Sequence, residues 1–198
     1  MERGWAAGAS LETWACAAVA VGERLAAFLE HQPGASRPRD YEHLRRQQLI
    51  VDVATRGGWR AMPEQPIDAD RLRSRSIDVF LERPSRREAA VTEIWDYFDD
   101  VGSSIRSFED KLAALRRHFD VGADLARAPV AVGGLFVVRG TRRNRALVRE
   151  FSSIFQARFP GSSVGWLAAL TDPAAPIPNR PALIWTDVRG ERLAAARL

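Results

Sequence analysis

The sequence predicts an α/β protein: a mixed β-sheet flanked by helices, with a small helical hairpin at the N-terminus. Three observations predict this fold. Helical and strand-like segments are mixed along the chain after residue 40. Two strand-like segments are joined by a short polar turn, which is typical of a β-hairpin. Of the 198 residues, 46% are hydrophobic and 27% are charged, a composition typical of a globular protein with a packed core.

The first expected element is a pair of helices near the N-terminus. Apolar side chains recur there at spacings of three and four residues, the period of a helix with one buried face. Ser10 is a candidate N-cap, and Gly22 separates a helix over Leu11–Val21 from one over Glu23–Glu30. Cys16, the single cysteine, lies on an alanine-rich face and is expected to be buried.

Composition divides the chain into three parts. We expect residues 1–32 to form the helical hairpin, residues 33–39 to form a linker with two prolines and a glycine, and residues 40–198 to form the α/β domain. No apolar run approaches the roughly 18 residues that span a bilayer, and no cleavable leader is evident at the start. We therefore expect a cytoplasmic protein with no membrane partner.

The elements of the α/β domain are predicted from periodicity and from glycine and proline positions. Helices are predicted over Tyr41–Arg56, Tyr97–Arg117 and Arg143–Phe159. A further strand is expected around Glu64. The remaining strands are predicted over Ser76–Glu82, Ala89–Trp95, Leu135–Arg139, Val164–Leu170 and Ala182–Asp187.

The turn between the two hairpin strands determines which side chains face each other. If residues 83–88 form the turn, Glu82 pairs with Ala89, and Asp78 then lies directly opposite Glu93 on one side of the sheet. Two opposed carboxylates repel each other unless a cation, a proton or an arginine lies between them. Asp78 and Glu93 are therefore candidate ligands of a divalent cation such as Mg²⁺.

Two alternatives to a metal site remain. The carboxylate pair could meet an arginine or solvent, or the turn could be shifted by one residue, which would place the two carboxylates on opposite faces. The other face of the hairpin is expected to pack into the core, through Ile77, Val79, Leu81 and Ile94.

The hairpin resembles a known family at this point. The stretches Ser76–Leu81 and Val91–Trp95, followed by a long helix, are similar to the metal-binding hairpin of the PD-(D/E)XK nuclease superfamily. The resemblance covers roughly residues 40–170 and implies a restriction-endonuclease-like fold. It implies that Asp78 and Glu93 bind Mg²⁺ together with Glu64, which is similar to an additional acidic residue of many members.

One position departs from the family pattern. Where the superfamily has a lysine two residues after the second carboxylate, this chain has Trp95, and an indole has neither a positive charge nor a basic nitrogen. Of the 29 basic residues, the single lysine is Lys111, on the helix that follows. Lys111 is either a candidate catalytic substitute or simply a retained helix residue. Trp95 either fills the former active site or stacks on a base or sugar.

The N-terminal segment is similar to a second family. Ser10–Ala15 and Val21–Leu29 resemble the last two helices of an Xre-type, lambda-repressor-like helix-turn-helix domain, and Glu2–Gly4 resembles the residues that follow its recognition helix. The sequence begins after most of the helices that read DNA in that family. The resemblance implies either a gene start assigned too late or a retained fragment used for packing or dimerisation. An unrelated amphipathic hairpin would show the same pattern.

Arginines gather where the strand ending at residue 139 meets the next helix. They form either a phosphate-binding patch or a solvated loop, since arginine binds phosphate through two parallel hydrogen bonds. The candidate nucleic-acid-binding residues are Arg139, Arg142, Arg143 and Arg145.

These observations favour a DNA-associated regulatory protein whose nuclease-like domain has lost catalysis, because Trp95 replaces the expected lysine. One alternative is an active Mg²⁺-dependent endonuclease in which Lys111 or an arginine supplies the missing charge. Another is a non-catalytic protein that forms a homodimer through Trp14, Leu25 and Phe28. Mg²⁺ is expected only where the carboxylate site is intact. DNA is the expected partner of the regulatory protein and of the endonuclease.

Overall fold

The computed structural model describes residues 10–24, 41–67, 76–98, 100–121 and 129–198. The chain divides into two compact units, Met1–Arg37 and Pro38–Leu198. None of the helices in the described ranges is long and apolar enough to cross a membrane.

The described part of the first unit is one helix, α1 (Leu11–Ala20). The Ser10 hydroxyl accepts a hydrogen bond from the Thr13 N–H, which confirms Ser10 as the N-cap. The predicted end of this helix before Gly22 is also confirmed, because α1 ends at Ala20 and Gly22 adopts a left-handed backbone with φ of 77°. Cys16 is exposed, so its expected burial is wrong; residues 10–24, the described part of this unit, include no second helix that covers it.

Most of the second predicted helix of the hairpin lies outside the described residues, and so do Leu25 and Phe28. Dimerisation through these side chains therefore stays a prediction.

The second unit is an α/β structure built on a six-stranded mixed sheet, as the sequence predicts. The strands follow one another across the sheet in chain order. The first two pairings are antiparallel, the next two are parallel, and the last is antiparallel. The strands are β1 (Arg60–Pro66), β2 (Ser76–Arg83), β3 (Glu88–Trp95), β4 (Ala131–Arg139), β5 (Ala182–Thr186) and β6 (Leu193–Ala195).

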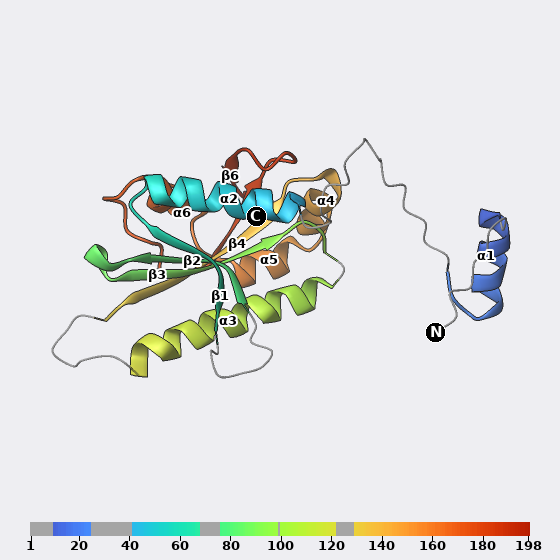
Figure 1. Ribbon diagram of the computed structural model, residues 1–198, viewed down its shortest axis with the longest axis horizontal. Helices are drawn as coiled ribbons and strands as arrows, with labels where there is room; N and C mark the ends of the chain where they lie inside the picture. The colour runs from blue at the N-terminus through green and yellow to red at the C-terminus, as the bar shows by residue number, and fades with distance from the viewer. Residues whose placement is uncertain (1–9, 25–40, 68–75, 99, 122–128) are drawn as a thin grey trace. The chain divides into compact units, whose positions relative to one another are not determined.

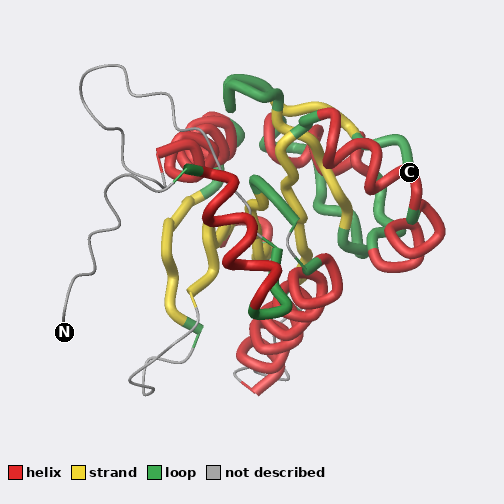
Figure 2. The backbone as a smooth tube through the Cα atoms, turned by 90° about the vertical axis from the view of Figure 1, so that its right-hand side faces the viewer, coloured by secondary structure: helices red, strands yellow, loops and turns green. Residues whose placement is uncertain are grey.

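Helices cover both faces of this sheet (Figures 1 and 2). One face packs against α2 (Tyr41–Arg56) and α6 (Ser163–Thr171), with Ile50, Ala54, Trp166 and Leu170 in the core between them. The opposite face packs against α3 (Val101–Val121), α4 (Arg142–Glu150) and α5 (Ser152–Arg158), through Ile105, Phe108, Val148, Phe155 and Phe159. A short 3-10 turn, Pro84–Arg86, joins β2 to β3.

The strand predicted over Val164–Leu170 is wrong, because this segment is the helix α6. Its N-terminus is capped by the Ser162 hydroxyl, which accepts a hydrogen bond from the Gly165 N–H at 3.0 Å. Trp166 and Leu170, one helical turn apart, are both buried. A short apolar run does not distinguish a strand from a buried helix by periodicity.

Two predicted helices have different bounds in the structure. The helix predicted from Tyr97 begins at Val101, because the Asp100 carboxylate caps it by accepting a hydrogen bond from the Ser103 N–H at 2.8 Å. The helix predicted over Arg143–Phe159 is interrupted at Phe151, which separates α4 from α5.

The predicted hairpin register is confirmed. Glu82 pairs with Ala89 and Val79 pairs with Thr92, so that Asp78 follows opposite Glu93. The assignment of Ile77 to the same core as Val79 is wrong, because Ile77 packs on the α3 side of the sheet. The β2–β3 pairing ends at Val79. Beyond it, the Asp78 carbonyl accepts a hydrogen bond from the Gln47 side chain, and the Asp78 N–H donates to the Glu93 carboxylate.

Candidate functional site

Asp78 lies in β2 between two other acidic residues. Across the β1–β2 pairing, Glu64 lies between the partners of Ile77 and Val79 and is therefore opposite Asp78. Across the β2–β3 pairing, Glu93 is opposite Asp78. The three predicted metal ligands thus occupy adjacent positions on three neighbouring strands.

Asp78 and Glu93 contact each other through the main chain. The Asp78 N–H donates to Glu93 Oε1 at 3.3 Å, and Asp78 Oδ2 accepts a hydrogen bond from the Ile94 N–H at 2.7 Å. Each carboxylate thereby satisfies a main-chain donor where the strand ladder ends. These bonds fix the two carboxylates side by side even without a bound cation.

Lys111 reaches this pair from α3. Its Nζ donates a hydrogen bond to Glu93 Oε2, and both side chains are buried, with Lys111 at 8% exposure and Glu93 at 2%. A buried carboxylate needs such a partner, because an unpaired charge inside a protein is costly. The structure therefore brings the single lysine of the sequence to the second carboxylate of the hairpin.

Glu64 is held by two polar side chains. Gln47, a buried residue of α2, donates through Nε2 to Glu64 Oε1 at 2.5 Å and to the Asp78 carbonyl at 3.1 Å. The Ser76 hydroxyl donates to Glu64 Oε2 at 2.7 Å. Glu64 also has a positive φ of 50°, a strained conformation for a residue with a side chain, of the kind that is concentrated at functional sites.

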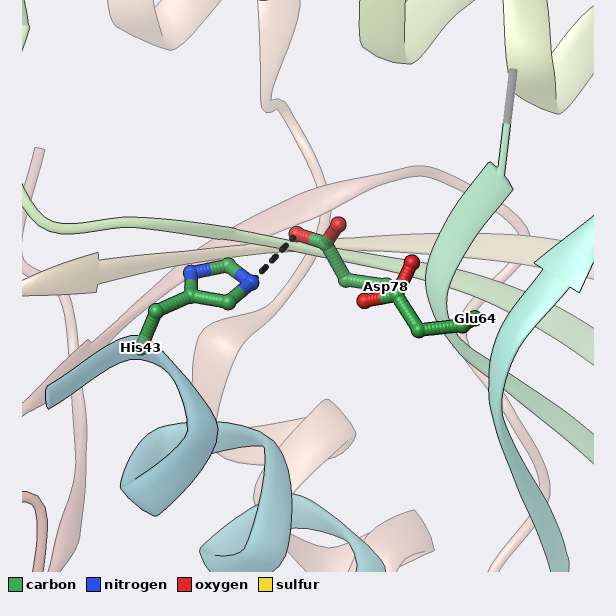
Figure 3. A group of neighbouring side chains, drawn as sticks. All are labelled: His43, Glu64 and Asp78. Carbon is green, nitrogen blue, oxygen red and sulfur yellow. Dashed lines mark ion pairs between the residues drawn. The ribbon is translucent and has the colours of Figure 1, made fainter. Parts of the chain in front are cut away.

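His43 joins the cluster from α2, one helical turn before Gln47. One nitrogen of its ring, Nε2, lies 3.9 Å from Asp78 Oδ2. His43, Glu64 and Asp78 each offer a ligand atom, and these atoms all lie within 4.8 Å of one another (Figure 3). Sequence reasoning missed His43; the only signal was its spacing of four residues from Gln47, which places both on one face of the helix.

The other nitrogen of the His43 ring faces a second carboxylate. Nδ1 lies 4.0 Å from Asp96 Oδ2, and Asp96 Oδ1 lies 2.7 Å from Nη1 of Arg46. Arg46 is fully buried and also donates to Thr186 Oγ1 and to the Val188 carbonyl. This network fixes Asp96 beside His43.

The protonation of the cluster is shifted by burial. Desolvation, reinforced by the charge of Asp78 and opposed by Lys111, raises the pKa of Glu93 to about 7. Desolvation also raises the pKa of Asp78, although the Ile94 hydrogen bond and the charges of His43 and Lys111 lower it. Both shifts show that burial disfavours two neighbouring carboxylate charges, and a cation bound between these carboxylates would compete with the proton that they retain.

Trp95 is partly buried and packs against the hydrophobic core rather than into the polar cluster. Its ring stacks on Phe98 and Phe136, with centroid separations of 6.5 and 6.1 Å. Whether the indole fills a former active site or stacks on a base or sugar stays a prediction.

The predicted arginines lie at the carboxyl end of β4 and at the start of α4. Arg139 is half-buried, with Nη1 donating to Tyr97 Oη at 3.2 Å and Nη2 3.9 Å from Glu42 Oε2. Arg142 and Arg143 are exposed in the first turn of α4. Arg145 is also exposed, but its guanidinium lies over the Trp185 ring, 4.7 Å from the centroid.

The arginines and the acidic cluster lie at the same end of the sheet. Trp95 ends β3 and pairs in parallel with Val138, so that Arg139 follows at the same edge. Glu93 is two residues before that edge.

Comparisons of the chain with protein-family models, with curated proteins and with solved structures find no match. The resemblances to the PD-(D/E)XK and Xre-type families therefore stay predictions from the sequence.

Proposed function

We propose that the second unit hydrolyses phosphodiester bonds in nucleic acid with the help of a divalent cation. The observation that carries the proposal is the contact of Lys111 with Glu93, beside Asp78. Position 95 has no positive charge, which by itself argues against catalysis. The contact of Lys111 with Glu93 supplies a positive charge from α3 instead.

Each side chain has a role in such a reaction. Asp78, with Glu64 or Glu93, provides the oxygen ligands that a divalent cation requires. A cation held there would lower the pKa of a bound water and neutralise charge on the scissile phosphate. Lys111 carries three N–H donors, enough to hold the attacking water or a phosphate oxygen while it remains bonded to Glu93.

A nucleic-acid substrate is favoured by the charge around the site. Arg142 and Arg143, in the first turn of α4, provide exposed guanidinium groups at the same end of the sheet as the acidic cluster. Positive charge at a helix N-terminus opposes the helix dipole, so an anionic partner at Arg142 and Arg143 would relieve an unfavourable arrangement. In this proposal, phosphates of the nucleic acid contact these arginines while the scissile phosphate lies at Asp78.

The test is cleavage of supercoiled plasmid in the presence of Mg²⁺ or Mn²⁺. We expect nicked or linear DNA with the wild-type chain, and no product after addition of EDTA or with Asp78→Asn. Asp52→Asn is the matched control, because Asp52 is an exposed residue of α2 whose carboxylate accepts a hydrogen bond from Gln48, away from the cluster. Cleavage that persists in EDTA or in purified Asp78→Asn would disprove the proposal.

A second candidate is a DNA-associated regulator without catalysis. It is favoured by Trp95, which fills the lysine position with an aromatic core residue. This candidate predicts salt-dependent DNA binding with no cation-dependent product in the same plasmid assay.

A further inference from the structure

His43 makes the cluster around Asp78 chemically different from a site made of carboxylates alone. Its Nε2 faces Asp78 Oδ2, and Glu64 offers an oxygen within the same 4.8 Å group. The imidazole is half-buried, with 29% of the side chain exposed, so it is open to an ion while restricted in its movement. Together these residues offer one nitrogen and at least two oxygen donors around one point (Figure 3).

The environment of His43 is arranged as it is for metal-binding histidines. In such sites the ring nitrogen that does not bind the metal usually faces a carboxylate, which fixes the orientation of the ring and makes the other nitrogen more basic. Asp96 is on that side, with Oδ2 4.0 Å from Nδ1. Asp96 is itself held by Arg46 at 2.7 Å, so Nε2 is the nitrogen that remains on the side of Asp78.

Donor type determines which cations such a site prefers. Mg²⁺ prefers oxygen ligands and keeps several of its waters, whereas imidazole is a good ligand for first-row transition metals. The two carboxylates suit Mg²⁺ and Mn²⁺ alike, and the added imidazole nitrogen favours the transition-metal ion of these two, Mn²⁺.

We propose that His43, Glu64 and Asp78 form a transition-metal site, with His43 as the residue that selects Mn²⁺-type ions over Mg²⁺ and Asp96 as the residue that positions the ring. The proposal deepens the proposed function, because it names the cation of the same site. It also stands on metal binding alone, whether or not DNA is cleaved.

The experiment measures metal binding to the full chain without DNA. Mn²⁺ and Mg²⁺ are titrated separately by calorimetry into the wild type, His43→Asn and His118→Asn. His118 is the control because it is an exposed histidine of α3 outside the cluster. We expect His43→Asn to weaken Mn²⁺ binding about tenfold or more while changing Mg²⁺ binding by less than about threefold. His118→Asn should bind both ions as the wild type does.

Pulsed electron paramagnetic resonance of bound Mn²⁺ provides a second readout that does not depend on affinity. We expect modulation from a directly bound nitrogen in the wild type and in His118→Asn, and its loss in His43→Asn. Mn²⁺ bound without nitrogen modulation, or equally well by His43→Asn, would overturn the role of His43.

The outcomes separate the two proposals. Binding that depends on His43, without DNA cleavage, would support the metal site and overturn the proposed hydrolysis. If His43→Asn cleaves DNA as the wild type does in both Mg²⁺ and Mn²⁺, the result would support hydrolysis and overturn the role of His43 in selecting Mn²⁺ over Mg²⁺. Absence of binding by either ion would overturn both.

Discussion

Lys111 Nζ donates a hydrogen bond to Glu93 Oε2, across 18 residues of sequence. The lysine comes from α3, whereas the sequence resemblance expects one on β3 at the position of Trp95. The two arrangements deliver a positive charge to the same carboxylate from different elements. The sequence shows only that β3 has no lysine at position 95. The contact shows that the site nevertheless has a lysine ammonium group, which α3 supplies.

Trp95 is predicted to act in stability and not in chemistry. Trp95→Ala removes the ring that stacks on Phe98 and Phe136, and we expect it to lower the free energy of unfolding by about 3 kcal/mol. Urea denaturation measures this loss. Cleavage per folded molecule should stay within about threefold of the wild type, so a large loss of cleavage by a well-folded variant would instead assign the indole a contact with substrate.

The raised pKa of Glu93 predicts that the metal-free protein becomes less stable as the pH rises. Burial raises this pKa from its ordinary value of 4.5 to about 7. Between these values the folded protein keeps a proton that the unfolded chain has released. This contribution to stability is therefore fully present below about pH 4.5 and is lost as the pH rises to about 7.

Thermal denaturation at about pH 5 and about pH 8 tests this expectation. The decrease in stability should be larger for the wild type than for Glu93→Gln, which cannot titrate at this position. Divalent cations should show the opposite trend: below about pH 7, each unit of increase in pH should tighten their binding by up to about tenfold, because the carboxyl must lose its proton to act as a ligand. An equal pH dependence in both proteins would contradict the shift.

Arg46 is predicted to be a major determinant of stability, because its charge is fully buried against Asp96. Arg46→Ala leaves that carboxylate without its partner, and we expect a loss of about 3–5 kcal/mol. The neighbouring Arg45 is the matched control, since it pairs with Glu191 near the surface and Arg45→Ala should cost less than about 1 kcal/mol. Urea denaturation measures the free energy of unfolding of both variants. Similar losses in the two variants would contradict the larger contribution assigned to Arg46.

The arginines of α4 are predicted to bind nucleic-acid phosphates. The double variant Arg142→Glu/Arg143→Glu should weaken DNA binding and reduce the slope of log affinity against log salt by about 1 for each phosphate that the variant no longer neutralises. Arg116 and Arg117, exposed on α3, give the control double variant Arg116→Glu/Arg117→Glu. Fluorescence anisotropy at several salt concentrations distinguishes them. Equal effects of the two variants would show that net charge, and not this patch, governs binding.

Short-range pattern is enough to predict the hairpin and its register. Alternation along β2 and β3 and the polar turn place Asp78 opposite Glu93, and the structure has this register. The helix Tyr41–Arg56 is also predicted with the correct bounds. These features depend on neighbours in sequence, where the spacing of apolar residues carries the signal.

The rest of the site depends on contacts between distant segments, which no local pattern encodes. His43 enters the cluster because α2 packs over β2, and Lys111 because α3 lies against β3. The sequence pattern of α6 predicts a strand because apolar residues also occupy the exposed side of the helix, which removes the helical periodicity. Val164 and Ala168 are exposed, whereas Trp166, Ala169 and Leu170 are buried. Long-range packing decides each of these positions.

The most direct test of the proposed hydrolysis is single-turnover cleavage of plasmid DNA by Lys111→Met, compared with the wild type, at a concentration of Mn²⁺ that saturates both. Metal binding should be retained, because Lys111 is not a ligand of the metal ion; its ammonium group competes with the ion for the Glu93 carboxylate. We predict a rate lower by about 10²–10³-fold, the loss typical of removing one group that stabilises charge in the transition state. A folded, metal-bound Lys111→Met protein that cleaves at the wild-type rate would contradict the central role given to this lysine.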